Sequence, residues 1–264
     1  MIRFAANLSM LFTEVPFLER FRAARDCGFE GVEFLFPYAW SAETLKDRLN
    51  SENLKQVLFN APPGNWDLGE RGIAGLPGRE TEFREGIDLA LNYALTLECQ
   101  NIHVMAGICP ENLSLEQSFE IYTQNIAYAA ERVASHAVSI LLEPINIRSF
   151  PGYILSHQAQ ARHLIDTLGY KNLRLQLDLF HAQIMEGDLT NLIRHQLSYI
   201  EHIQLASVPD RHEPDEGEIN YNWIFKELSR LSYRGWIGCE YIPRGDTKTG
   251  LAWLKEARRL LDEK

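Results

Sequence analysis

The sequence of 264 residues predicts an α/β fold, and three observations support that prediction. Eight short apolar runs recur along the chain, and each is followed by a longer stretch with helical periodicity. This gives one unit per 33 residues (264 divided by 8), which suits a barrel of about 250 residues. The runner-up, a doubly wound open sheet, usually carries a glycine fingerprint, but neither GxGxxG nor GxxxxGK[ST] occurs. We therefore expect one domain over residues 1–264, a (β/α)8 or TIM barrel.

The expected strands are short runs rich in β-branched and other apolar residues. The sixth run, LRLQLD, alternates leucine with polar residues and ends on Asp178, which is unusual for a strand buried inside a sheet. The eight runs cover residues 2–7, 31–36, 54–60, 101–107, 138–144, 173–178, 199–206 and 236–241.

The expected helices are the longer stretches between these runs. They lie near residues 15–27, 41–52, 79–97, 115–136, 157–169, 188–197, 221–232 and 247–262. Several begin at residue types that cap helix N-termini, namely Ser41, Ser114, Asn220 and Thr247. Others end before a glycine, namely Gly28, Gly169 and Gly235.

Composition limits the classes of partner. The chain has 26 basic and 36 acidic residues, a formal charge of −10, whereas proteins that bind nucleic acid usually present a basic face. We therefore expect no nucleic-acid partner, although a small anionic substrate needs only one or two local cations. No stretch approaches the roughly 20 apolar residues of a membrane helix, and the opening MIRFAANLSMLF does not resemble a signal peptide.

The cysteines indicate the redox compartment. Cys27, Cys99, Cys109 and Cys239 show neither CxxC nor CxxH spacing, which is typical of reduced core thiols. We expect a cytoplasmic protein without a membrane partner, and the oligomeric state stays open.

Polar residues occur at the end of nearly every expected strand, where barrel enzymes place their active sites. They are Asn7, Glu33, Asn60, His103, Glu143, Asp178, Gln204 and Glu240. Some have plain structural readings: Asn7 and Asn60 either form turns or face the substrate, Glu33 suits a salt bridge, and His103 suits a buried core position.

The last four of these residues predict a metal site. Glu143, Asp178, Gln204 and Glu240 lie on consecutive strands, which neighbour one another at about 4.8 Å. Three converging carboxylates repel one another unless a cation or a proton compensates. Carboxylate and amide oxygens suit a hard divalent ion, so we expect Mg2+, with Mn2+ as the alternative.

Longer blocks of the sequence resemble a known family. FAANLSMLFTEVPFLERF, GERGIAGLPGRE, LLEPIN, LDLFHAQ, DRHEPDEGEINY and GWIGCEY are similar to the hydroxypyruvate isomerase family, and most of all to its 2-oxo-tetronate isomerase branch. The similarity runs from Ile2 to about Trp253. It implies a xylose-isomerase-like TIM barrel that isomerises small hydroxy-oxo acids with a divalent metal.

The resemblance also implies residue roles. The family's metal ligands fall on the same four residues, but related ketose epimerases typically use histidine where this chain has Gln204, which disfavours a ketose 3-epimerase. The same relatives place a substrate-binding histidine three residues after the aspartate, which matches His181. They place an arginine shortly after strand seven, and Arg211 matches it one residue late.

The implied reaction moves a proton between neighbouring carbons through an enediol. One carboxylate removes the proton and another delivers it, so we assign Glu143 and Glu240 as the catalytic acid and base as well as metal ligands. The substrate is either a 2-oxo-tetronate or hydroxypyruvate. Two other readings remain: a metal-dependent nuclease of the same superfamily, disfavoured by eight histidines and the acidic charge, and a non-catalytic ligand-binding barrel.

The predicted metal ligands make one half of the barrel mouth acidic, so the substrate carboxylate needs a cationic side chain from elsewhere. The candidates are Arg71 and Arg79 in the glycine-rich loop after strand three, and Arg211 with His212 after strand seven. The strand-three loop suits a lid over a small substrate. Alternatively, it is a packed surface loop whose arginines pair with Glu70 and Glu80.

Overall fold

Eight parallel strands close into a barrel in chain order, as the sequence predicts. A computed structural model describes residues 2–262, so residues 1, 263 and 264 of the predicted domain lie outside the described residues. Each strand pairs with the next, and β8 pairs with β1 to close the barrel. The strands are β1 (Arg3–Asn7), β2 (Gly31–Phe34), β3 (Lys55–Asn60), β4 (Asn101–His103), β5 (Ser139–Leu142), β6 (Leu173–Asp178), β7 (Ile200–Leu205) and β8 (Trp236–Cys239).

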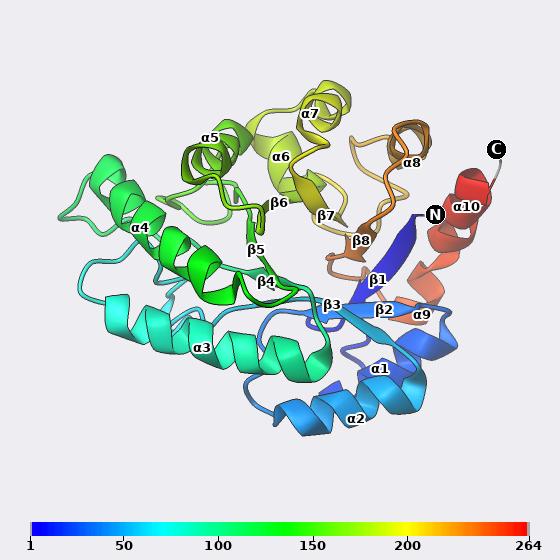
Figure 1. Ribbon diagram of the computed structural model, residues 1–264. Coiled ribbons are helices and arrows are strands. Elements are labelled where there is room, and N and C mark those ends of the chain that lie inside the picture. The colour runs from blue at the N-terminus through cyan, green and yellow to red at the C-terminus, as the bar shows by residue number, and fades with distance from the viewer. Residues whose placement is uncertain (1, 263–264) are drawn as a thin grey trace.

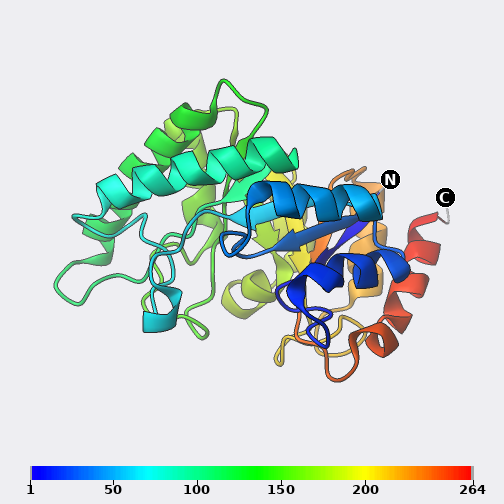
Figure 2. The same ribbon diagram turned by 90° about the horizontal axis from the view of Figure 1, so that it is seen from below.

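Helices surround the strands, and the two ends of the chain lie on the same side of the molecule (Figures 1 and 2). The helices of the eight units are α1 (Phe17–Asp26), α2 (Ala42–Glu52), α3 (Glu80–Leu97), α4 (Leu115–Val133), α5 (Gln158–Leu168), α7 (Leu189–Gln196), α8 (Tyr221–Arg230) and α10 (Ala252–Asp262). Their apolar faces pack on the outer face of the barrel, where the main hydrophobic core lies. Every helix within residues 2–262 is too short or too polar to cross a membrane.

Three short helices interrupt the simple alternation that the sequence predicts. They are η1 (Trp66–Leu68), α6 (Leu179–Met185) and α9 (Thr247–Gly250). Helix α6 begins directly after β6, because the Asp178 side chain accepts a hydrogen bond from the Phe180 backbone and caps it. Asp178 therefore ends a strand and starts a helix.

Three of the four predicted N-caps are correct, and the fourth, near the C-terminus of the chain, is wrong. Ser41, Ser114 and Asn220 accept backbone hydrogen bonds as N-caps. The predicted cap Thr247 is wrong: Asp246 caps α9, while Thr247 is buried and its hydroxyl accepts from the Phe12 backbone.

The predicted glycine stops are correct in part. Gly169 ends α5 in a left-handed conformation, and Gly28 follows the end of α1 with a positive φ of 83°. The stop predicted at Gly235 is wrong, because α8 already ends at Arg230. The cysteines are free, with Cys99 and Cys239 buried and Cys27 and Cys109 half-buried, as expected for reduced thiols.

The barrel interior is polar near the carboxyl ends of the strands, and these polar side chains support the residues of the site. Asn7, Glu33, Gln176, His202 and Gln204 are buried there and contact one another. Room for this cluster comes from a glycine of β8: a Cβ atom at Gly238 would lie 2.3 Å from a Glu33 carboxylate oxygen.

Candidate active site

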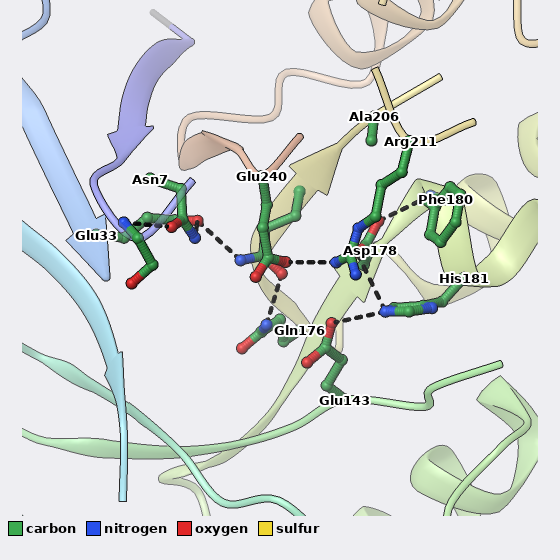
Figure 3. A network of polar contacts seen from close by, with 12 residues as sticks. Asn7, Glu33, Glu143, Gln176, Asp178, Phe180, His181, Ala206, Arg211 and Glu240 are labelled. Carbon is green, nitrogen blue, oxygen red and sulfur yellow. Dashed lines mark hydrogen bonds and ion pairs between the residues drawn. The ribbon is translucent and has the colours of Figure 1, made fainter. Parts of the chain in front are cut away.

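The four predicted metal ligands lie at the carboxyl ends of β5 to β8. Asp178 is the last residue of β6 and pairs in register with Gln204 of β7. Glu143 and Glu240 each follow their strand by one residue. All four side chains are buried, and the three acidic ones converge on the same space, as Figure 3 shows.

Burial and mutual repulsion disfavour the charged forms of these carboxylates. Burial raises the pKa of Glu143 well above its ordinary value, and the charges of Glu240 and Asp178 raise it further. Burial likewise raises the pKa of Glu240 to about 8, despite the nearby charge of Arg211. Burial also raises the pKa of Asp178, again against the opposing effect of Arg211. The cluster therefore favours a proton or a cation between its members.

Arg211 supplies part of that positive charge. Its Nη2 lies 3.2 Å from Glu240 Oε2 and 3.5 Å from Asp178 Oδ2 (Figure 3). The guanidinium also stands 4.9 Å from the centre of the Phe180 ring. Its Nε is buried without a hydrogen-bond partner, so one N–H remains available to an anion.

His181 lies in the first turn of α6 and is buried between two of the carboxylates. Its Nε2 is 3.5 Å from Asp178 Oδ2 and 4.0 Å from Glu143 Oε1. Burial lowers the pKa of His181 well below its ordinary value, and the charge of Arg211 adds to that effect, so the ring is neutral. A neutral imidazole can donate one hydrogen bond and accept another.

The residues present fit a divalent cation. Glu143, Asp178 and His181 each offer a ligand atom, and these atoms lie within 4.8 Å of one another. Glu143 Oε1 is buried without a hydrogen-bond partner, although a buried carboxylate oxygen normally has one. This group of three residues has two carboxylates and an imidazole, and Glu240 is not part of it. The predicted set of three carboxylates and an amide oxygen, which would suit a hard ion, stays a prediction.

Gln204 is oriented by a network below the carboxylates. Its Nε2 donates to Glu33 Oε1 at 2.8 Å, and its Oε1 accepts from Gln176 Nε2 at 2.6 Å. Glu33 also accepts from His202 at 2.7 Å and from Asn7 at 3.1 Å. The Gln204 amide is thus fixed with its nitrogen toward Glu33, which leaves the second lone pair of its oxygen for another partner.

Asn7, Asn60 and His103 complete the opposite side of the mouth. Asn7 forms the expected turn, since its Oδ1 accepts from the Ser9 backbone, while its Nδ2 joins the Glu33 network. Asn60 Oδ1 lies 3.2 Å from His103 Nδ1, which is also 3.4 Å from Glu143 Oε2. Seven of the eight predicted strand-end residues, all except Asp178, line one small cavity.

The remaining candidates for anion binding lie in surrounding loops. Arg79 is paired with Glu70 and Glu82. This resembles the alternative of a packed surface loop, except that Glu82 takes the place of the expected partner Glu80. The Arg71 guanidinium stacks 3.9 Å from the Trp66 ring centre and donates to the Trp66 and Glu70 carbonyls. His212 Nδ1 lies 2.7 Å from the Ile242 carbonyl. Among the four anion-binding candidates that the sequence indicates, these three and Arg211, only Arg211 contacts the predicted metal ligands.

Sequence reasoning missed three residues of the site. Gln176 and His202 lie two residues before Asp178 and Gln204, and the two-residue period of a strand places them on the same face, a signal that was available. Asn146 contacts His181 from the loop after β5, and no sequence pattern indicated it.

Comparisons with known proteins identify the family of the chain. A family model described as a xylose isomerase-like TIM barrel matches residues 21–257. The 2-oxo-tetronate isomerase of Pectobacterium atrosepticum is 50% identical over 255 residues, which is 97% of each chain. The hydroxypyruvate isomerase of Escherichia coli is 46% identical over 258 residues, which is 98% of this chain and 100% of that protein.

A solved structure is similar over the whole barrel. The crystal structure of a protein described as an AP endonuclease of family 2, from Brucella melitensis, has a TM-score of 0.94 and 54% identity. The match covers 97% of this chain and 99% of that chain. The chain therefore belongs to the xylose isomerase-like TIM barrels and, within them, to the hydroxypyruvate isomerase family, and it is an enzyme of the isomerase class.

Proposed function

We propose that the protein is a metal-dependent isomerase of small hydroxy-oxo acids. It would convert 2-oxo-tetronate to 3-oxo-tetronate, or hydroxypyruvate to tartronate semialdehyde, by proton transfer through an enediol. The observation that carries the proposal is the convergence of three buried carboxylates with raised pKa values, one oxygen of which has no hydrogen-bond partner. The names of the relatives at 50% and 46% identity support the substrate class.

The metal would be held by Glu143, Asp178, Gln204 and Glu240, with Mg2+ preferred and Mn2+ as the alternative. When bound, a divalent ion acts as a Lewis acid toward the carbonyl and the adjacent hydroxyl of the substrate. The Glu33 network supports this assignment, because it fixes the Gln204 amide and leaves an oxygen lone pair available.

Proton transfer would be carried out by Glu143 and Glu240. One carboxylate removes the proton from the carbon that bears the hydroxyl, and the carbonyl oxygen gains a proton to give an enediol. The other carboxylate then delivers a proton to the former carbonyl carbon, while the former hydroxyl oxygen loses its proton and becomes the new carbonyl. Atoms and electrons balance within the substrate, so no redox cofactor is needed.

Substrate recognition would fall to His181 and Arg211, with Arg71, Asn7 and Asn60 as further candidates. His181 Nε2 lies near two ligand carboxylates, where it can donate to a substrate oxygen. Arg211 has a buried Nε–H without a partner, which suits the substrate carboxylate. Asn7 has both ends of its side chain engaged, so its contribution would be to hold Glu33.

The expected partner is a small anionic substrate, with no nucleic acid and no membrane, and we expect the protein to lie in the cytoplasm. The Brucella melitensis relative is described as an AP endonuclease, which makes nuclease activity the second candidate. A formal charge of −10 disfavours it. Binding to heparin resin together with several zinc ions per chain would support the nuclease instead.

A substrate panel tests the proposal. Purified protein is treated with EDTA, and turnover of C3 and C4 hydroxy-oxo acids and of a neutral ketose is followed by 1H NMR with and without Mg2+. We expect turnover of an acid only with the metal, and solvent deuterium in the product carbon. Turnover restricted to the ketose would indicate an epimerase, and no turnover of any substrate would favour a ligand-binding barrel. Product without deuterium would favour a hydride shift.

A further inference from the structure

Asn146 directs two hydrogen-bond donors at one nitrogen of His181. Its side-chain Nδ2 lies 2.5 Å from His181 Nδ1, and its backbone nitrogen donates to the same atom at 3.4 Å. Asn146 is fully buried in the loop after β5, and His181 is buried in α6.

The orientation of the Asn146 amide is fixed by its own partners. Asn146 Oδ1 accepts a hydrogen bond from the Ser149 backbone at 2.7 Å, so the NH2 group must face the histidine. The second donor to His181 is a backbone N–H, which has no alternative orientation. Both contacts therefore require a lone pair on Nδ1.

A lone pair on Nδ1 determines where the ring proton lies. An imidazolium carries hydrogen on both nitrogens, and the Nδ1–H tautomer has no acceptor at that position. The remaining form is neutral with its hydrogen on Nε2. That nitrogen is 3.5 Å from Asp178 Oδ2 and 4.0 Å from Glu143 Oε1, so the N–H is directed into the active site.

The tautomer decides which chemistry His181 can perform. A ring nitrogen that carries hydrogen has no lone pair for a metal, although position alone places Nε2 among possible ligand atoms. We propose that Asn146 is a positioning residue that holds His181 in the Nε2–H form, which keeps the imidazole out of the metal's ligand shell and makes it a donor to a substrate oxygen. The role toward the substrate rests on the proposed function, whereas the tautomer does not.

The tautomer can be read directly by NMR of protein with 15N-labelled histidine, without metal or substrate. The chain has eight histidines, and the spectrum of His181→Gln identifies the His181 signals by their loss. In the wild type at pH 7 we expect protonated Nε2 and bare Nδ1. Protonated Nδ1, in a neutral ring or in an imidazolium, would overturn the proposal regardless of any variant.

Asn146→Asp replaces the side-chain donor by an acceptor of nearly the same shape. We expect hydrogen to appear on His181 Nδ1 and kcat to fall roughly 10-fold, because the substrate oxygen loses its hydrogen-bond donor. The preference for Co2+ over Mg2+ should rise roughly 10-fold, because Nε2 gains a lone pair that suits the softer ion. Asn146→Ala keeps only the backbone donor and should give a mixture of tautomers.

Asn125→Asp is the matched control. Asn125 is likewise a buried asparagine, but its Nδ2 donates to the backbone carbonyl of Ala74 and not to His181. It should leave the His181 spectrum and the metal preference unchanged. If Asn146→Asp and Asn146→Ala both keep the wild-type tautomer, Asn146 does not set it. Absence of isomerase turnover in the wild type would contradict the proposed function but leave the NMR result standing.

Discussion

Two buried glutamates at the mouth of the barrel have opposite surroundings. Glu33 of β2 is 1% exposed, and its carboxylate accepts hydrogen bonds from Asn7, His202 and Gln204. Glu143, after β5, is 5% exposed, yet its Oε1 has no hydrogen-bond partner, and the nearby charges of Glu240 and Asp178 raise its pKa further. Both residues lie near the carboxyl end of a strand, and both side chains are removed from water.

The difference in their partners indicates which buried carboxylates are structural and which are available for function. A buried charge is costly unless partners compensate it, and the protein itself compensates Glu33. At Glu143, Asp178 and Glu240 the compensation is incomplete, because Arg211 contacts only two of the three. Glu33 therefore belongs to a supporting network that Asn7 of β1 and residues of β6 and β7 complete. The three carboxylates at the ends of β5, β6 and β8 keep an uncompensated charge, which under the proposed function would be neutralised by a cation.

The largest expected effect concerns the proposed acid and base. Glu143→Gln and Glu240→Gln keep the side-chain volume but remove the proton acceptor, so each should lower kcat by at least ~100-fold. Initial rates on the best substrate of the panel, at saturating Mg2+, measure this. Rates near the wild type in either variant would remove that residue from the proton transfer.

Stability should respond in opposite directions on the two sides. Glu33→Gln leaves the buried His202 with a weaker acceptor and should lower the free energy of unfolding by about 2–3 kcal/mol. Glu143→Gln should raise it in metal-free protein at pH 8. The sign follows from the raised pKa of Glu143: as the pH rises above about 4.5, the unfolded chain loses a proton that the folded protein retains, which favours unfolding.

Urea denaturation of both variants in the presence of EDTA gives these values. A loss of stability in both would show that the carboxylates of β5 to β8 are as well compensated as Glu33, and the comparison would fail.

The contrast between Glu33 and Glu143 could be predicted only in part from the sequence. The two-residue period of a strand and the length of the repeating units predicted the barrel and the positions of Glu143, Asp178, Gln204 and Glu240. The partners of Glu33 could not be predicted, because His202 lies 169 residues away and reaches it only when the barrel closes. Helix α6 has seven residues, too few to show a helical period. Asn146 acts through the tautomer of His181, and such an indirect role has no recognisable sequence pattern.

A smaller effect distinguishes the arginines. Arg211→Ala should raise KM for an acidic substrate roughly 10-fold or more at saturating Mg2+, since a charge-assisted hydrogen bond contributes about 1.5–3 kcal/mol. Arg71→Ala should change it less, because the Arg71 guanidinium stacks on Trp66 and donates to loop carbonyls. The same variants are then measured on a neutral ketose analogue. Equal losses on acidic and neutral substrates would show that the arginines shape the loops and do not bind the carboxylate.

The central claim, that the carboxylates of β5 to β8 are held open for a cation, is tested most directly by titrating Mn2+ into chelator-treated protein and measuring free Mn2+ by EPR. We expect one ion per chain, with affinity increasing as the pH rises through about 8, because burial raises the pKa of Glu240 to about 8 and the ion displaces its proton. Glu143→Gln should abolish the binding. Glu227→Gln should retain it, because that buried glutamate is already paired with Arg194 and Arg230. A wild-type protein that binds no ion at any of these pH values, or that turns over substrate fully without one, would contradict the claim.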